Sequence, residues 1–275
     1  MLDKTEFAQP AVFVTSLAAA EKFKIDFPEY HENCIAAAGF SVGELAALVF
    51  ADCLDFEQGL KLLKVRAESM QAASNVVPSA MATVKLKAAS KLETAIKDAI
   101  KHARKSGVAA PVLRRANYLY SSCVTVGGHS EAIDFLLEHF EDYKLVDVKK
   151  LPLSGAFHTS LMDSAEKEFK RALFASQVEF RPGRMPVYSN CSGKAYDFSR
   201  GRDRDWKKLL HKQITRPVKW QSIVYEIGAN LRDASARDKR DEFPAYFELG
   251  PGKQLTTTLL KSNRLAARNA KSIEC

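Results

Sequence analysis

The sequence lacks any long hydrophobic run, and this absence excludes one class of protein. Hydrophobic residues make up 46% of the 275 residues, but no apolar stretch reaches the roughly 20 residues that a membrane-spanning helix needs. The first residues mix acidic and basic side chains and resemble neither a secretory leader nor an Arg-rich transit sequence. We therefore expect no membrane partner, and no targeting segment is visible in this chain.

Paired cysteines and internal repeats are also lacking. Five cysteines are scattered along the chain without Cys-x-x-Cys spacing. This pattern predicts neither a metal site nor a disulfide framework, and a reducing compartment is the default for such a chain. The cysteines are Cys34, Cys53, Cys123, Cys191 and Cys275.

Basic residues exceed acidic ones, which gives a net charge of +8. They are dispersed rather than gathered in one stripe. A local cluster at residues 101–105 lies late in a predicted helix, where cations complement the helix dipole, so a solvated helix end explains it better than a binding patch. The charge favours an acidic partner or an anionic substrate, and we expect no nucleic-acid partner.

The most informative motif is Gly-Phe-Ser-Val-Gly at residues 39–43, between an apolar strand and an apolar helix. It is typical of a nucleophile elbow, in which a strained turn lifts the hydroxyl of Ser41 above the sheet. The amide of Val42 would then point to where an oxyanion forms. An ordinary turn with a capping serine also fits the spacing, but the switch from strand to helix favours the elbow.

Strands and helices alternate along both outer parts of the chain. This alternation favours an α/β fold with a mostly parallel sheet. Segment 230–242 is rich in charged and small residues and predicts an exposed loop or helix end. We predict helices at 11–25, 57–73, 166–176, 206–213 and 219–228 and from 254 onward, and strands before Gly39, at 186–189 and at 245–249.

Between Pro78 and Pro152 the pattern changes to strand-helix-strand-strand-helix-strand. This βαββαβ order is that of a ferredoxin-like split βαβ unit. We therefore predict a ferredoxin-like small subdomain at residues 80–150, inserted into a larger α/β subdomain formed by 1–79 and 151–275. The predicted strands are 81–86, 112–117, 123–126 and 144–151, and the helices are 90–105 and 131–140.

A serine nucleophile needs a base, and the candidate is His158. It lies in a loop between a predicted strand and a predicted helix, and histidine is the residue whose pKa suits this task. From the residues alone, a structural role for His158 stays open as well. The remaining histidines have plain interpretations as loop, helix-end or solvated-face residues: His31, His102, His129, His139 and His211.

Further motifs follow the elbow in a fixed order along nearly the whole chain. Together they resemble the malonyl-CoA:acyl-carrier-protein transacylases, most closely the animal mitochondrial form. The resemblance implies an α/β-hydrolase-like large subdomain beside the ferredoxin-like one, and a mitochondrial location. The motifs are residues 39–44, 66–70, 155–159, 188–190, 213–220 and 248–255.

The resemblance also implies a role for each site residue. Ser41 would take the malonyl group as an ester, and His158 would accept its proton and return it to the leaving thiol. In the family a backbone carbonyl orients the histidine, and the matching position here is Gln213. Arg66 would hold the malonyl carboxylate through two parallel hydrogen bonds.

Two of the candidate residues have a second interpretation. Without the resemblance, Arg66 fits a surface ion pair with Glu68 or another neighbour. Asn190 follows a predicted strand and is a candidate for positioning the His158 loop or the substrate, but a turn-capping role fits it equally well.

The implied reaction passes a malonyl group from malonyl-CoA to the phosphopantetheine thiol of acyl carrier protein, for fatty acid synthesis. It needs no metal and no other cofactor, and the acidic carrier suits a basic enzyme. A serine thioesterase or hydrolase is one alternative, although such enzymes usually orient the histidine with Asp or Glu. A catalytically weak form that only binds acyl carrier protein is the other.

One element of the family pattern is missing before Ser41. Family members begin with a strand and a Gly-Gln-Gly-Ser-Gln loop that supplies a second oxyanion donor, and no such sequence occurs here. Loss of one oxyanion donor typically costs about 10² to 10³ in rate. We therefore expect this chain to be weakly active or poorly folded, and a version extended at its N-terminus to be active.

Overall fold

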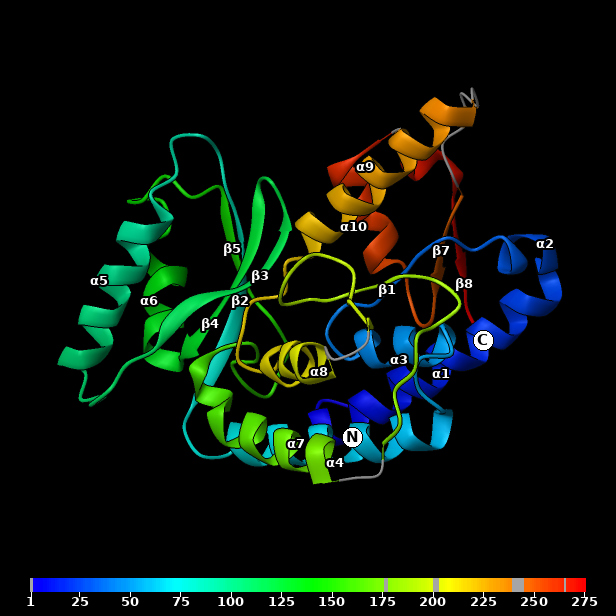
Figure 1. Cartoon of the computed structure of the whole chain (residues 1–275). Helices are drawn as coiled ribbons and strands as arrows, with labels where there is room; N and C mark the ends of the chain where they lie inside the picture. Colours follow the sequence, from blue (N-terminus) through cyan, green and yellow to red (C-terminus); the bar gives the residue numbers. More distant parts are fainter. Residues whose placement is uncertain (1, 176–177, 200–202, 239–244, 265) are drawn as a thin grey trace. The chain divides into compact units, whose positions relative to one another are not determined.

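The computed structural model describes residues 2–175, 178–199, 203–238, 245–264 and 266–275 (Figure 1). Among these residues we find no helix with the length and apolar character needed to cross a membrane. The chain divides into two compact units. Unit 1 comprises the described residues within 1–8, 64–176 and 211–218, and unit 2 those within 9–63, 177–210 and 219–275.

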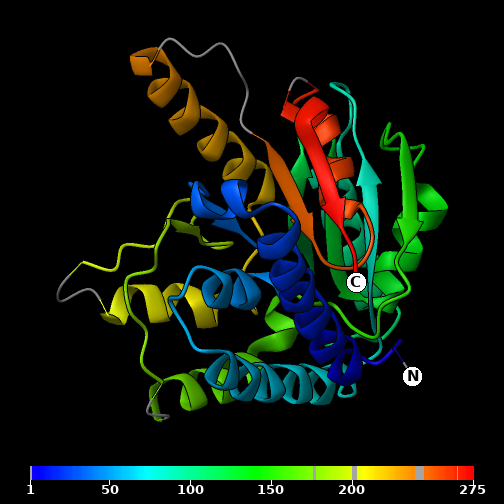
Figure 2. The same ribbon diagram turned by 90° about the vertical axis from the view of Figure 1, so that its right-hand side faces the viewer.

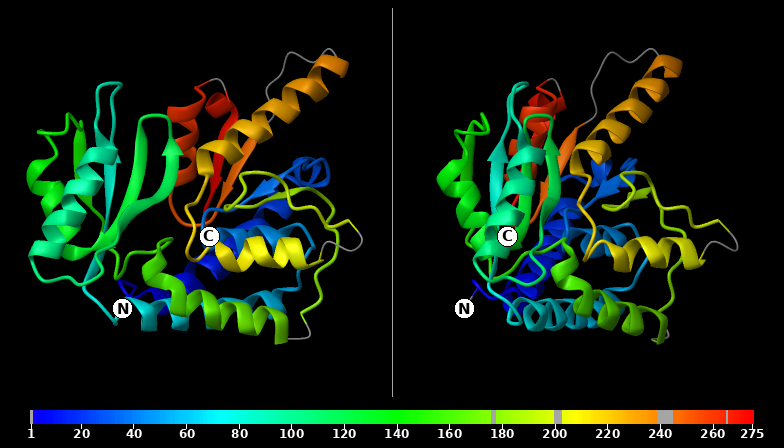
Figure 3. Two further views of the ribbon diagram at one scale, coloured as in Figure 1. Left: turned by 60° about the vertical axis from the view of Figure 1, so that its left-hand side comes forward. Right: turned by 90° about the vertical axis from the view of Figure 1, so that its left-hand side faces the viewer.

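Unit 1 contains a four-stranded antiparallel sheet in the order β3-β4-β2-β5. Helices α5 (Leu92–Lys105) and α6 (Ser130–His139) pack on one face of this sheet (Figure 3). The predicted βαββαβ order of elements is confirmed. The strands are β2 (Ser79–Lys85), β3 (Leu113–Tyr120), β4 (Cys123–His129) and β5 (Asp147–Lys150).

Alternating side chains explain why both helices share that face. Ala80, Ala82 and Val84 of β2 all point to the core that the helices cover, because side chains two positions apart lie on the same face of a strand. Burial of this apolar stripe holds the sheet and helices together.

The boundaries of these elements differ from those predicted by up to three residues, and local turns explain two of the differences. Strand β5 begins at Asp147 rather than 144, because Lys144 has a φ of 57° and cannot continue a strand. Helix α5 begins at Leu92 rather than 90. The Ser90 hydroxyl accepts a hydrogen bond from the Lys87 amide and donates one to the Lys144 carbonyl, so Ser90 belongs to the preceding turn.

Helix α4 (Phe56–Ser74), predicted at 57–73, has a buried apolar stripe over only part of its length. Leu63, Ala67 and Met70 are buried, whereas Phe56 is exposed at the first helical position. From Lys64 onward α4 belongs to unit 1, and this part of the helix carries Arg66. Unit 1 also contains η1 (Ser160–Met162) and α7 (Asp163–Ala175); the last residue of the predicted helix 166–176 lies outside the described residues.

Unit 2 contains two short parallel pairs of strands rather than one continuous sheet. β1 (Ala37–Ala38) pairs with β6 (Val187–Tyr188), and β7 (Tyr246–Leu249) pairs with β8 (Ala270–Ile273) (Figure 2). The predicted parallel pairing is confirmed; the predicted single sheet is wrong for the described residues. β1 stops after Ala38 because the chain turns into a helix at once.

The remaining predicted helices are present, but α1 begins six residues earlier than predicted, α9 extends further, and α2 and η2 were not predicted. α9 continues to Asp238, through much of the segment predicted as a loop or helix end, because Ala, Arg and Leu in that segment favour a helix. Residues 239–242 of that segment lie outside the described residues. The helices are α1 (Thr5–Asp26), α2 (Pro28–Glu32), α3 (Gly43–Phe50), α8 (Asp203–Lys212), α9 (Trp220–Asp238), α10 (Gln254–Ser262) and η2 (Ala266–Asn269).

Candidate active site

Ser41 occupies a tight, strained turn between β1 and α3. Its φ is 54°, in the left-handed region that a serine rarely adopts. The turn is possible because Gly39 has no side chain: a Cβ there would lie 1.8 Å from the Gly43 carbonyl oxygen. This is the geometry predicted for an elbow.

The alternative of a capping serine does not describe this turn. Helix α3 begins at Gly43 with Val42 as its N-cap, and it has no side-chain cap hydrogen bond. Val42 therefore stands at the positive end of the helix dipole, where an amide is well placed to stabilise negative charge.

Asn190 follows β6 in the chain, and its side chain holds the main chain of the elbow. Its Oδ1 accepts a hydrogen bond from the Ser41 amide at 2.7 Å, and its Nδ2 donates one to the Gly39 carbonyl at 2.7 Å. One fully buried side chain thus fixes the main chain on both sides of the turn. This bracing was not foreseen from the sequence; a direct substrate contact by Asn190 stays a prediction.

A fully buried carboxylate, that of Glu44, lies beneath this brace. Its Oε1 accepts hydrogen bonds from the Asn190 amide at 3.1 Å and from the Tyr196 hydroxyl. Burial first, and then the Glu44 charge, raise the pKa of Tyr196 well above its ordinary value, so the hydroxyl remains a donor. One weak signal of this network is visible in the sequence, an acidic residue in the first turn of an apolar helix.

In unit 1, His158 also occupies a left-handed turn, with a φ of 59°. Its Nδ1 lies 2.6 Å from the Gln213 carbonyl oxygen. A carbonyl only accepts hydrogen bonds, so Nδ1 carries the proton, and in the neutral ring the lone pair is on Nε2. This is the tautomer that a general base uses.

Burial keeps His158 neutral. The side chain is 3% exposed, and desolvation, followed by the charge of Arg66, lowers the pKa of His158 to about 4. The carbonyl groups of Gln213 and Arg216 act in the opposite direction. At pH 7 the imidazole is therefore ready to accept a proton.

Arg66 is buried next to this histidine rather than at the surface. Arg66 is 1% exposed, and its Nη2 donates a hydrogen bond to the Gln213 side-chain oxygen at 2.7 Å. The alternative of a surface ion pair with Glu68 or another neighbour does not hold, because Arg66 is buried; Glu68 pairs with Lys64 at 3.8 Å. A spacing of four residues from Leu62 turns Arg66 to the buried side of α4.

Gln213 thus connects two candidate site residues. Its main-chain oxygen meets His158 and its side-chain oxygen meets Arg66. The contact between Gln213 and Arg66 joins α4 to the segment after α8, and no local sequence pattern predicts this contact. The structure brings together two groups within its units: Ser41, Val42 and Asn190 in unit 2, and Arg66, His158 and Gln213 in unit 1.

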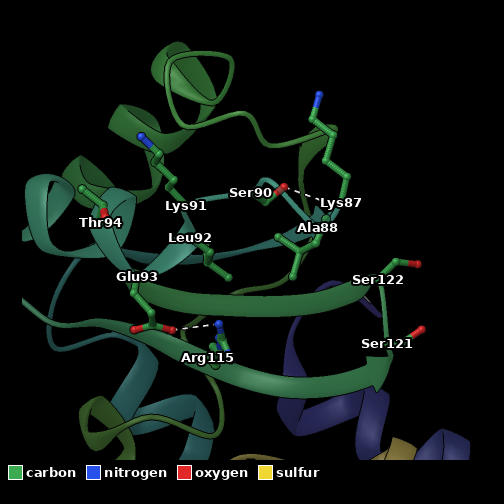
Figure 4. A pocket seen from close by; sticks show the side chains of 11 residues that line it. Lys87, Ala88, Ser90, Lys91, Leu92, Glu93, Thr94, Arg115, Ser121 and Ser122 are labelled. Atoms are coloured by element: carbon green, nitrogen blue, oxygen red, sulfur yellow. Dashed lines mark hydrogen bonds and ion pairs between the residues drawn. The ribbon is translucent and has the colours of Figure 1, made fainter.

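A separate pocket of about 400 Å³ opens at the start of α5 in unit 1 (Figure 4). Its charged lining includes Lys87, Lys91 and Arg115, and Arg115 pairs with Glu93 at 2.8 Å. None of the candidate catalytic residues lines this pocket.

Comparison with known proteins identifies the family. The model of the acyl transferase domain matches residues 1–230. The chain belongs to the acyl transferase family. The resemblance predicted from the ordered motifs is thereby confirmed.

This acyl transferase is similar to two mammalian proteins. It is 40% identical over 273 residues to the mitochondrial malonyl-CoA-acyl carrier protein transacylase of Mus musculus, covering 99% of this chain and 68% of that protein. The Homo sapiens protein of the same name is also 40% identical over 273 residues, with 99% and 67% covered.

The fold of this acyl transferase is also found in a solved structure. The malonyl CoA-acyl carrier protein transacylase of Coxiella burnetii superimposes with a TM-score of 0.79 at 24% identity, covering 99% of this chain and 77% of that one. At this identity the likeness supports the fold alone, an α/β fold with parallel and antiparallel sheets.

Proposed function

We propose that this acyl transferase moves a malonyl group from malonyl-CoA to the phosphopantetheine thiol of acyl carrier protein, through a malonyl ester on Ser41. The observation that carries the proposal is the buried cation of Arg66, held by the same residue, Gln213, that orients the neutral His158. The names of the mammalian relatives support the same reaction, which supplies fatty acid synthesis.

In the first half-reaction, His158 Nε2 accepts the proton of the Ser41 hydroxyl as its oxygen attacks the thioester carbonyl. The carbonyl oxygen becomes negative and accepts a hydrogen bond from the Val42 amide. When the carbon–sulfur bond breaks, the histidine returns the proton to the CoA sulfur, and the malonyl ester of Ser41 remains.

The second half-reaction repeats these steps with a different thiol. His158 accepts the proton of the carrier thiol, the sulfur attacks the ester carbonyl, and the bond to the Ser41 oxygen breaks. The proton then passes to that oxygen. No metal or redox group takes part in this scheme.

Arg66 supplies the preference for a carboxylated acyl group. Its planar guanidinium suits a bidentate pair with the malonyl carboxylate. An acetyl group offers no carboxylate to this buried cation, so its transfer gains nothing from the contact.

The orienting group of the histidine favours transfer over hydrolysis. His158 Nδ1 meets a main-chain carbonyl, whereas a serine thioesterase or hydrolase usually places Asp or Glu there. The net charge of +8 suits an acidic carrier as the second substrate.

We further propose the domain division and location implied by the resemblance. The sheet order β3-β4-β2-β5 with two helices on one face supports a ferredoxin-like subdomain at residues 80–150. Residues 1–79 and 151–275 would form the α/β-hydrolase-like subdomain. The relatives' names favour a mitochondrial location.

Mass spectrometry tests the proposed function. After incubation with malonyl-CoA, we expect a malonyl adduct on Ser41 that is absent from Ser41→Ala and retained in the exposed control Ser121→Ala. Added acyl carrier protein should remove the adduct and gain the malonyl group. Release of free malonate in place of this transfer would indicate a hydrolase. Absence of the adduct would indicate a protein that only binds the carrier.

A further inference from the structure

We infer that Glu166 is a positioning residue that clamps the segment carrying Gln213, and thereby holds His158 and Arg66 together. The inference rests on the proposed function, because Gln213 matters only if His158 and Arg66 take part in the reaction. All of these residues belong to unit 1.

The carboxylate of Glu166, near the start of α7, grips the segment on both sides of Gln213. Its Oε1 lies 3.0 Å from His211 Nδ1, and its Oε2 accepts a hydrogen bond from the Thr215 hydroxyl. His211 precedes Gln213 by two positions and Thr215 follows it by two. One side chain therefore fixes the segment before and after the residue that orients the base.

Both contacts are directional and shielded from water. The side chains of His211 and Glu166 are 5% and 20% exposed, and Thr215 is buried. A carboxylate only accepts hydrogen bonds, so His211 must donate from Nδ1 and Thr215 from its hydroxyl. Charge-assisted bonds of this kind are stronger than neutral ones. Their loss leaves His211 Nδ1 without this acceptor and the Thr215 hydroxyl with the longer contact to the Lys212 carbonyl at 3.4 Å.

The clamped segment holds the catalytic histidine at two points. The Gln213 carbonyl meets His158 Nδ1, and the Ile214 carbonyl accepts a hydrogen bond from the His158 main-chain amide at 3.1 Å. The Gln213 side chain at the same time contacts Arg66. A shift of the segment would move the tautomer-setting carbonyl and the partner of Arg66 together.

Because one segment holds both His158 and Arg66, replacing Glu166 should have effects that replacing a merely structural residue would not have. Loss of Glu166 should lower the rate of the chemical step and also reduce the preference for malonyl over acetyl. A general loss of stability would lower the amount of folded protein while leaving both the tautomer of His158 and the acyl preference unchanged.

The experiment compares variants of α7 in the full chain. Glu166→Leu removes both acceptors at similar size, and Glu166→Gln retains an acceptor oxygen. Glu168→Leu is the matched control, because Glu168 lies on the same helix, is half exposed and pairs with Arg171 at 2.6 Å. The readouts are kcat and KM for malonyl and acetyl transfer, and the ring-nitrogen NMR spectrum of His158, which reports its tautomer without any turnover.

We expect Glu166→Leu to lower kcat/KM for malonyl transfer by about 10- to 100-fold, since small misplacements of catalytic groups have effects of this size. Acetyl transfer should fall less, and the Nδ1–H tautomer of His158 should lose population. Glu166→Gln should recover most of the activity, and Glu168→Leu should match the wild type.

An unchanged His158 tautomer in Glu166→Leu overturns the inference, as does equal activity of Glu166→Leu and Glu168→Leu. If Glu166→Leu does not fold, Thr215→Val removes the hydroxyl that donates to Glu166 and to the Lys212 carbonyl while the contact between Glu166 and His211 remains. It should shift the tautomer in the same direction, and no shift there overturns the inference as well. A wild-type chain that forms no malonyl-Ser41 contradicts the proposed function, and the NMR comparison still decides whether Glu166 positions His158.

Discussion

The turn of Ser41 and the turn of His158 share one backbone conformation and differ in how they are held. Both residues have positive φ, 54° and 59°, a conformation that costs a non-glycine residue roughly 1–2 kcal/mol. Ser41 is held by a side chain, Asn190, that binds the elbow main chain. His158 is held by carbonyl groups of the 211–215 segment, one on its ring and one on its amide.

The difference follows from what each residue must do. A nucleophile has to meet a substrate, and Ser41 is only partly buried. A base has to stay neutral and in one tautomer, and burial with a main-chain acceptor gives His158 both properties. Both turns therefore place a residue in the left-handed region of backbone space, but the Ser41 residue is partly exposed whereas the His158 residue is buried.

Replacing the base should have the largest effect. We expect His158→Ala to slow formation of the malonyl ester by about 10² to 10⁴-fold, the usual contribution of a general base, while the Ser41 turn stays intact. Rapid-quench measurement of CoA release checks this. A loss below threefold would remove His158 from the role of base.

Removing the guanidinium beside the base should have the next largest effect. Arg66→Ala should weaken malonyl transfer by about 10- to 100-fold, because charge-assisted hydrogen bonds contribute about 1.5–3 kcal/mol, and acetyl transfer should fall less. Arg66→Lys keeps the charge without the planar fork and should recover only part of the loss. Competition between malonyl-CoA and acetyl-CoA measures the preference, and equal losses for both would exclude the carboxylate role.

Removing the brace of the serine turn should act on stability and rate together. Asn190→Ala leaves the Ser41 amide and the Gly39 carbonyl without this partner, so unfolding in urea should become easier by about 1–3 kcal/mol, and acylation should slow. Asn33→Ala is the control, since Asn33 Nδ2 donates only to the exposed Glu29 carbonyl. The comparison of the two turns fails if both variants unfold alike.

The pH dependence should show the smallest effect and concerns the histidine turn alone. The folded pKa of His158, about 4, lies below its ordinary value of 6.5, so between these values the unfolded chain binds a proton that the folded chain does not. Stability from this residue is present above pH 6.5 and is lost as the pH falls towards 4.

From pH 7 to 5.5 the expected loss is about 1 kcal/mol, and His158→Gln should abolish that part of the slope. Urea unfolding at the two pH values measures it. The rate of ester formation should stay level down to about pH 5, and a midpoint near 6.5 would show that His158 is not desolvated.

The Ser41 turn could be predicted from the sequence because its cause is local. Gly39 and Gly43 allow strand and helix to meet within a few residues, and that pattern is visible in one short stretch. The strands and helices of the βαββαβ block were found for the same reason, since their periodicity is a property of each segment. In the described residues the outer parts form two separate parallel pairs rather than the one mostly parallel sheet predicted, because pairing between distant short strands has no local signal.

The support of His158 could not be predicted in this way. His158 contacts the segment after α8, and that segment in turn contacts α4 and α7; only the fold brings these parts of the chain together. His211 has the helix-end position expected of it, yet it is buried against the Glu166 carboxylate, and in the sequence a buried histidine of an amphipathic helix looks like a solvated one. Glu44 was missed because a first-turn glutamate has an ordinary role at a helix N-terminus.

The four-stranded sheet of unit 1 has two edges, and each is protected against pairing with another chain. Strand β5 is short and ends in two exposed lysines, Lys149 and Lys150, which oppose the addition of a further strand. At the opposite edge, Tyr118 donates its amide to the Val218 carbonyl, and Val218 donates to the Ala116 carbonyl. The segment that carries Gln213 thus continues directly to Val218, which occupies the outer edge of β3. We infer that the same stretch of chain supports the site and limits edge-to-edge aggregation.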